Sequence, residues 1–158
     1  MSITWTLKDN FAAVESAMRD ACAAAMESSA QTIAANAAAN APVDTSALQN
    51  SIYVVTPNGS DYDQHVAAAV SQAATGGAKT PPKDISKQIL PQALLLPDPN
   101  RIEAAVASVV DYAESVEEGG SRPNGTHAAP QPFLAPAGDG ALNNVQDALA
   151  TALQIALG

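Results

Sequence analysis

The sequence has few of the residues that build a thick hydrophobic core. Aromatic residues make up only 4% of its 158 residues, and Leu, Ile, Val and Phe together number 31. Alanine alone accounts for 35 of the 74 hydrophobic residues. The length corresponds to one domain, so we expect residues 1–158 to form a single domain with a thin core. Partner subunits would then supply part of its stability.

Three further shortages exclude whole classes of protein. The single cysteine, Cys22, cannot form an internal disulfide, and no Cys/His spacing typical of zinc sites is present. No run approaches the roughly 18–20 apolar residues that span a bilayer, and residues 1–9 lack the pattern of a signal peptide. Seven basic against 16 acidic residues give a net charge of −9, which argues against a protein that binds tightly to nucleic-acid phosphates. We expect synthesis in a reducing cytoplasm and no membrane contact.

A long alanine-rich helix is predicted from about residue 10 to residue 40. Its apolar stripe recurs at three- and four-residue steps and comprises Phe11, Val14, Met18, Cys22, Met26 and Ile33. Pro42 ends the helix because proline removes a backbone donor and restricts the residue before it. Cys22 lies on the stripe, so we interpret it as a buried small hydrophobe and not as a nucleophile.

The rest of the chain alternates strand, turn and helix patterns. The Asn58-Gly59 pair is the preferred chemistry of a tight hairpin turn. Around it we predict strands over 50–56 and 64–71, then a strand over 101–110, a short helix over 111–118 capped by Asp111, and a last helix over about 141–157. The inward face of that last helix is expected to comprise Leu142, Val145, Leu149, Leu153 and Ala156. This order predicts an α+β fold in which the long first helix packs on a small antiparallel sheet.

Residues 73–100 form a proline-rich insert that differs from the rest of the chain. It holds five of the eleven prolines and three of the seven basic residues, and its one predicted helix is short, over 84–90. Proline excludes a long helix or a central strand here. Its large aliphatic residues are Ile85, Ile89, Leu90, Leu94, Leu95 and Leu96. We predict an extended arm that becomes ordered mainly on a partner; the alternative is a loop folded back on its own domain.

No residue pattern points to catalysis or to a cofactor. Asp61, Asp63 and His65 would share one face of a strand and could bind a metal ion. No second ligand cluster accompanies them, so we interpret them as a solvated strand edge. His127 lies in a Gly/Pro-rich loop and is expected to be exposed. The sequence indicates no enzyme, no metal and no cofactor.

Three short segments, in this order, resemble the small tail-completion or neck proteins of siphophage-like tailed phages. Residues 41–52 read APVDTSALQNSI, residues 112–119 read YAESVEEG, and residues 132–137 read PFLAPA. Ser46 stands where the family pattern has glycine. The motif residues are Pro42, Asp44, Thr45, Leu48, Ser51, Ile52, Tyr112, Val116, Glu117, Gly119, Pro132, Phe133 and Leu134. The insert over 73–100 has no counterpart in the pattern.

The residue chemistry of these motifs is that of a scaffold. Asp44 or Thr45 can cap a turn that leads from helix to sheet, with Val43, Leu48 and Ile52 holding that corner to the core. Tyr112 and Val116 lie at positions i and i+4, so one face packs inward and leaves Glu114, Glu117 and Glu118 outside. Phe133 is expected to anchor the last helix. Each motif is either core or a contact between subunits.

The resemblance implies a virion structural protein at the head–tail junction, in the neck at the top of the tail. It implies a ring of identical subunits through which DNA passes, with six copies matching the symmetry of the tail, or twelve on the portal side. Portal, adaptor or stopper proteins and tail-tube proteins would be neighbours. An acidic lining would let DNA pass without binding it. A tail-terminator ring is the nearest alternative, and a non-viral soluble helical binding module is an alternative from another class.

Overall fold

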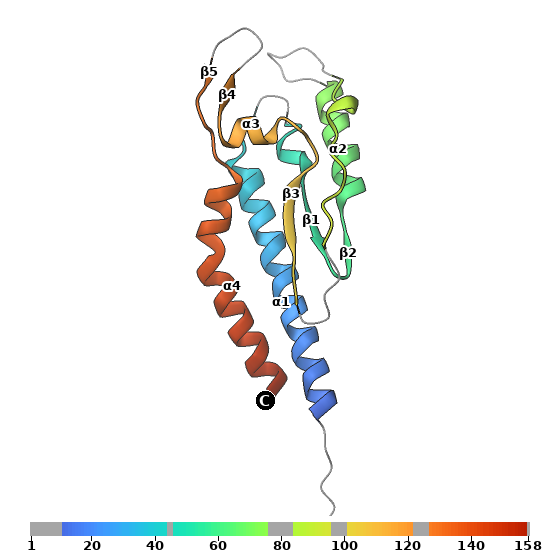
Figure 1. Cartoon of the computed structure of the whole chain (residues 1–158), viewed down its shortest axis with the longest axis vertical. Helices are drawn as coiled ribbons and strands as arrows, with labels where there is room; N and C mark the ends of the chain where they lie inside the picture. Colours follow the sequence, from blue (N-terminus) through green and yellow to red (C-terminus); the bar gives the residue numbers. More distant parts are fainter. Residues whose placement is uncertain (1–10, 44–45, 76–83, 96–100, 122–126, 158) are drawn as a thin grey trace, which may run out of the picture.

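The computed structural model describes residues 11–43, 46–75, 84–95, 101–121 and 127–157. Two long helices, α1 (Phe11–Asn40) and α4 (Leu134–Leu157), lie side by side and run in opposite directions (Figure 1). A three-stranded antiparallel sheet lies between this helix pair and α2 (Tyr62–Thr75). The expected α+β fold is confirmed.

The sheet has the strand order β2-β1-β3, with β2 over Gly59–Ser60, β1 over Ile52–Thr56 and β3 over Ala105–Ser108. Ile52 pairs with Ser108 and Val55 with Ala105. The short elements around the sheet are the 3-10 helices η1 (Gln49–Ser51) and η2 (Ser86–Gln88), the helix α3 (Ala113–Glu117), and a second hairpin of β4 (Gly120–Ser121) and β5 (His127–Ala128). No helix in the described part of the chain is long and apolar enough to cross a membrane.

The core forms where small residues of α1 pack closely against the apolar strand β1. Ala30, Ala34 and Ala37 of α1 are at most 8% exposed, and they repeat at the spacing of one helix face. Residues 52–55 of β1 are all buried because α1 contacts the sheet on one side and α2 on the other. Alanine therefore contributes to the core by letting backbones come close, since it has little side-chain volume to bury.

The apolar stripe predicted for the first half of α1 is not core. Phe11 is 81% exposed and Val14 is 39% exposed, and Cys22 is only partly buried. The reason is that the sheet ends part-way along α1, so this half of the helix extends beyond it (Figure 1). The prediction that Cys22 is a buried hydrophobe is therefore wrong.

The strand predicted over 64–71 is wrong, because these residues belong to α2. The Asn-Gly turn does form, but β2 is only two residues long. The backbone amide of Tyr62 then donates to the hydroxyl of Ser60, and that of His65 donates to the carbonyl of Asp61. With its first turn satisfied in this way, an alanine-rich segment takes its preferred helical conformation.

Several predicted boundaries also differ from the structure. The strand predicted over 101–110 is reduced to β3, and the short helix predicted over 84–90 is the single turn η2. The last helix begins seven residues earlier than predicted, at Leu134. Leu142, placed by the pattern on its inward face, is 61% exposed, whereas Ala141 is 2% exposed. Asp111 does not cap α3, whose N-cap is Tyr112.

Candidate assembly interface

A carboxylate from one motif caps the helix that begins in another. The Glu117 carboxylate accepts backbone N–H bonds from Phe133 at 2.8 Å, Leu134 at 3.0 Å and Ala135 at 2.9 Å. These are the amides at the start of α4, which have no partner within the helix. A negative charge at a helix N-terminus is also favoured by the helix dipole. Glu117 is thus turned toward α4, and the prediction that it faces outward is wrong.

The environment of Glu117 favours its charged form. Partial burial by itself would raise the pKa of Glu117, but the hydrogen bonds from three backbone amides lower it by more. The pKa of Glu117 therefore lies below its ordinary value of 4.5. The neighbouring Glu114 and Glu118 are exposed, as predicted. One of the three acidic side chains in this segment therefore holds two elements together, while the other two face solvent.

The backbone next to this cap requires glycine at one position. Gly119 has a φ of +74°, and a Cβ at this position would lie 2.7 Å from the carbonyl oxygen of Ala128 and 2.9 Å from the nitrogen of Pro130. The strand pair β4-β5 closes directly after it, and Gln131 donates its amide to the carbonyl of Val116 at 2.8 Å. Gly119 lets the returning chain approach α3 closely enough for Glu117 to reach α4.

The anchor predicted at Phe133 is buried. Phe133 is fully buried at the start of α4, and Tyr112, Val116 and Leu134 pack against the same core. Pro132 is exposed. The prediction that Tyr112 and Val116 face inward is confirmed.

The first motif forms the corner between α1 and the sheet. Leu48, Ser51 and Ile52 are each at most 5% exposed, and the Ser51 hydroxyl lies 2.7 Å from the hydroxyl of Ser108. Pro42 is half-buried, whereas Val43 is 68% exposed, so the prediction that Val43 holds the corner to the core is wrong. Asp44 and Thr45 lie outside the described residues.

Ser46 occupies a backbone conformation that favours glycine. Its φ is +61°, the left-handed region, where a side chain is disfavoured. The Ser46 carbonyl accepts the backbone amide of Asn50 at 3.0 Å and its side-chain amide at 2.8 Å, which fixes the turn. The glycine in the family pattern therefore has a physical reason at this position.

The described part of the insert packs on its own chain. Ile85 is 2% exposed in the core, and Ile89 and Leu95 pack against that core. The amide of Ala93 donates to the Tyr53 hydroxyl at 2.7 Å, and the Tyr62 hydroxyl donates to the carbonyl of Leu90 at 2.7 Å. For these residues the folded-back alternative is the one observed, and the arm prediction is wrong for Ile85.

Of the aliphatic residues predicted to form the arm, Leu90 and Leu94 are exposed in the described part of the insert. Leu94 is 85% exposed and Leu90 is 41% exposed. Leu96 lies outside the described residues, as do Lys79 and Lys83. A role in binding a partner stays a prediction for Leu90 and Leu94.

The three candidate metal ligands do not share one face, because Asp61 directly precedes α2 whereas Asp63 and His65 lie within it. Asp61 accepts the backbone amide of Val54 at 2.7 Å, and its other oxygen lies 3.4 Å from Nε2 of His65. Nδ1 of His65 lies 2.9 Å from the carbonyl oxygen of Asn50. Asp63 is exposed. The strand face that would have joined the three does not exist, and no group of three His, Cys, Asp or Glu side chains among the described residues could hold a metal ion.

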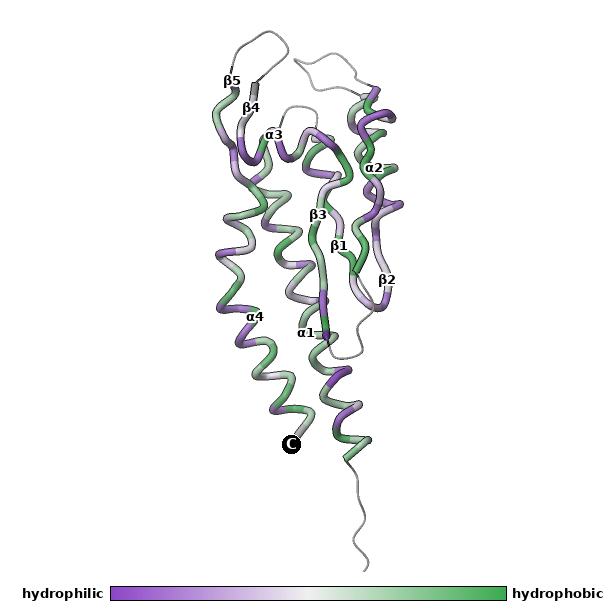
Figure 2. Tube along the Cα trace, in the orientation of Figure 1, coloured by the Kyte–Doolittle hydropathy of each residue, from purple (hydrophilic) through white to green (hydrophobic). Residues whose placement is uncertain are grey.

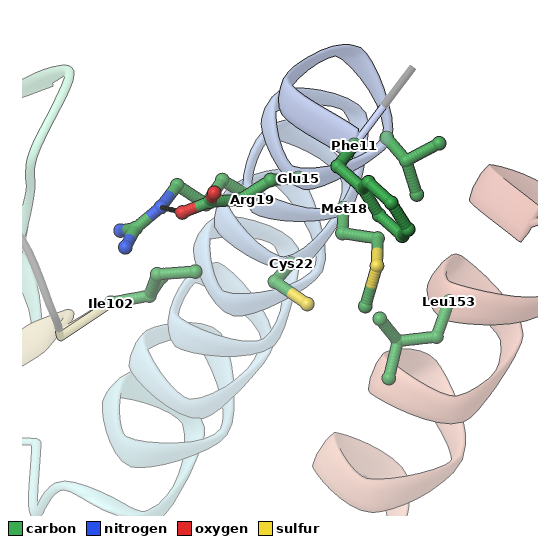
Figure 3. Close-up of a pocket in the computed structure, with 8 residues that line it drawn as sticks. Phe11, Glu15, Met18, Arg19, Cys22, Ile102 and Leu153 are labelled. Atoms are coloured by element: carbon green, nitrogen blue, oxygen red, sulfur yellow. Dashed lines mark ion pairs between the residues drawn. The ribbon is translucent and has the colours of Figure 1, made fainter. Parts of the chain in front are cut away.

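An open apolar groove lies where the helix pair extends beyond the sheet. Its volume is about 490 Å³. Figure 3 shows Phe11 and Met18 of α1 and Leu153 of α4 on one side and Ile102 on the other, with an ion pair between Arg19 and Glu15 at 3.6 Å along the edge. Val14 and Cys22 complete the lining. Sequence reasoning placed most of these residues in the core, so it did not predict a groove.

Residues 6–119 match the family model described as "HK97-gp10_like: Bacteriophage HK97-gp10, putative tail-component". The chain belongs to this family. The match contains the corner with Ser46 and the segment with Glu117 and Gly119, and it ends before the start of α4. Comparisons with curated proteins and with solved structures gave no match. The resemblance to phage tail components is confirmed.

Proposed function

We propose that the chain is a subunit of a ring at the head–tail junction of a tailed phage, where it completes the tail and lets DNA pass. The observation that carries this proposal is the family match over residues 6–119 to a phage tail component. Six copies would match the symmetry of the tail, and portal, adaptor or stopper and tail-tube proteins would be its neighbours.

The surface of the molecule supports a role in assembly. Exposed large apolar side chains occur on three elements, at Phe11 on α1, at Leu142 and Ile155 on α4, and at Leu94 in the insert. Such residues on several faces suit a subunit that contacts more than one neighbour. The net charge of −9 suits a lumen that DNA passes without binding. Membership in a family of phage tail components also argues against the alternative function, a non-viral binding module.

Deleting the gene from the phage that carries it tests the proposal. We expect DNA-filled heads and tails of normal length that fail to join, seen by negative-stain electron microscopy. Tails of irregular, excessive length would instead assign the tail-terminator role. Normal infectious particles would contradict both. Restoring the wild-type gene on a plasmid is the control, and native mass spectrometry of the protein bound to isolated tails would count the copies.

A further inference from the structure

The strand β3 lies at the edge of the three-stranded sheet (Figure 1). The backbone amide of Val109 donates to the carbonyl of Ser51 at 2.9 Å, which is the side toward β1. Because backbone groups alternate between the two sides of an antiparallel strand, the N–H and C=O groups of Ala104, Val106 and Ser108 point away from β1. Within the described part of the chain, no backbone group pairs with them on that outer side.

The chain itself pairs along the next part of this outer edge. The amide of Leu90 donates to the carbonyl of Val109 at 2.7 Å, and the amide of Asp111 donates to the carbonyl of Gln88 at 2.9 Å. This contact closes the edge from Val109 onward and leaves residues 102–108 without a partner there among the described residues. An unpaired edge offers a row of backbone donors and acceptors to another strand. The outer edge is thus suited to strand pairing, and the subunit uses only part of it.

The open stretch lacks the features that usually protect an edge strand. Residues 104–108 read AAVAS, with no proline and no charged side chain, and each of them is partly exposed. Directly before them, Arg101 and Glu103 form an ion pair, so their charges cancel. Protein edges that stay single are commonly guarded by lysine, proline or a bulge. This stretch is therefore a site for pairing with another chain.

Charge and length favour a second copy as the partner. Copies of a chain with a net charge of −9 repel one another overall, whereas this edge carries no net charge. Two identical edges satisfy each other's donors and acceptors when they pair antiparallel. The open stretch 102–108 has Ala105 at its midpoint. With a two-fold axis there, Ala104 of each copy lies opposite Val106 of the other, and no like charges are directly opposed.

We propose that the outer edge of β3 pairs antiparallel with the same edge of a second copy and joins the two sheets into one. The contact is isologous, because the same surface is used on both subunits. It therefore closes in a dimer and leaves no edge at β3 for unrelated strands. The contacts of the proposed ring would come from other faces, so this inference does not rest on that ring.

Cysteine cross-linking tests the proposal on the full-length chain with Cys22→Ser as background. Ala105→Cys places a thiol at the two-fold axis, where opposed Cα atoms are about 4.5 Å apart and a disulfide can form. Ala107→Cys is the matched control, because this partly exposed residue of β3 lies opposite Glu103. Its two copies would be about 13 Å apart along the strands, at about 3.3 Å per residue.

Under mild oxidation, Ala105→Cys should form disulfide-linked dimers at least about tenfold faster than Ala107→Cys, since only its thiols are within bonding distance. A non-reducing gel measures both rates. Equal rates for the two variants would overturn the proposed pairing. A thiol of Ala105→Cys that joins a different protein in assembled tails, from a chain that is monomeric when purified, would assign the edge to that protein and overturn the second copy.

Proline at position 104 tests the backbone hydrogen bonds. Ala104→Pro removes an N–H that points away from β1, so the ladder within the subunit keeps its bonds. Analytical ultracentrifugation should show a dimer for the wild-type chain and a dissociation constant at least about tenfold higher for Ala104→Pro, because the dimer loses hydrogen bonds at both copies. Circular dichroism checks the fold of the variant. A wild-type chain that stays monomeric, or a folded Ala104→Pro dimer as tight as the wild type, would overturn the proposal.

Discussion

The two ends of the helix pair α1 and α4 differ in which of their residues are buried. Next to the sheet, small residues such as Ala37 and Ala141 are at most 2% exposed. Beyond the sheet, much larger apolar residues such as Phe11 and Ile155 are more than three-quarters exposed. Figure 2 shows hydrophobic residues along both ends of α4. Burial in this molecule therefore depends on what covers a position, and the size of the side chain does not decide it.

At the end of the helix pair that lies beside the sheet, hydrogen bonds also join separate elements of the fold. Glu117 connects α3 to α4, and the Tyr53 and Tyr62 hydroxyls hold residues 90–93 in place. The uncovered end has the groove. We infer that the sheet end sets the stability of the subunit and the far end is free to serve contacts. Four predictions test this comparison, in order of decreasing effect.

The two phenylalanines of the chain lie at opposite ends, so they form a matched pair. Phe133→Ala empties a fully buried site and should lower the free energy of unfolding by about 3–5 kcal/mol. Phe11→Ala should cost about 1 kcal/mol or less, because the side chain is 81% exposed. Urea denaturation followed by circular dichroism measures both. Equal losses for the two variants would contradict the division into a covered and an uncovered end.

Glu117→Gln should destabilise the chain by about 1.5–3 kcal/mol at pH 7, because charge-assisted bonds to the first amides of α4 are weakened. In the unfolded chain the carboxyl titrates near 4.5, and in the folded chain its pKa is lower. The stabilisation is therefore complete above pH 4.5 and is lost as the pH falls through the folded pKa. Melting curves between pH 7 and pH 3 measure this loss.

The exposed Glu118 is the control for that pH dependence. Glu118→Gln should keep the wild-type pH profile, whereas Glu117→Gln should flatten it. A Glu117→Gln profile that follows the wild type over the whole range would show that the cap does not contribute to stability.

Ser46→Gly should raise the free energy of unfolding by about 0.5–1 kcal/mol. Glycine removes the cost of a side chain at a φ of +61°, and its greater freedom in the unfolded chain offsets only part of that gain. The melting temperature should increase by about 2 °C. Ser46→Ala is the comparison that keeps the Cβ, and it should give no increase. A lower melting temperature for Ser46→Gly would mean that the Ser46 side chain itself stabilises the corner.

Ile155→Ser should have the smallest effect on the isolated subunit, within about 0.5 kcal/mol, because the side chain is already 77% exposed. Its effect should instead appear in assembly, as weaker binding of the subunit to isolated tails. Differential scanning fluorimetry and a pelleting assay with tails measure the two quantities. A large loss of thermal stability would place Ile155 in the core of the subunit.

The sequence predicted the elements whose signals are local. The first helix, expected over about 10–40, is observed over 11–40, since capping, alanine content and Pro42 all act within a few residues. The strand expected over 64–71 was wrong because the hairpin turn was given more weight than the helix propensity of alanine. The last helix was predicted too short because its cap comes from Glu117, which is distant in the sequence.

The candidate interface was predictable only where a motif needed a single backbone feature. The glycine expected in place of Ser46 and the glycine at position 119 both correspond to positive φ values. The groove was not predicted, because the apolar period of α1 is the same whether or not another element covers it. Only the length of the sheet decides which part of that stripe is buried, and the sheet forms from distant segments.

The cap on α4 shows that the end of the family match is not the boundary of a folding unit. The match stops at residue 119, two residues after a carboxylate whose partners are residues 133–135. A chain cut at that point would leave Glu117 without its donors, and the cavity that Phe133 fills would be empty. The matched segment of this chain therefore does not contain all the partners of its own side chains. Its folding depends on the helix α4 that it caps.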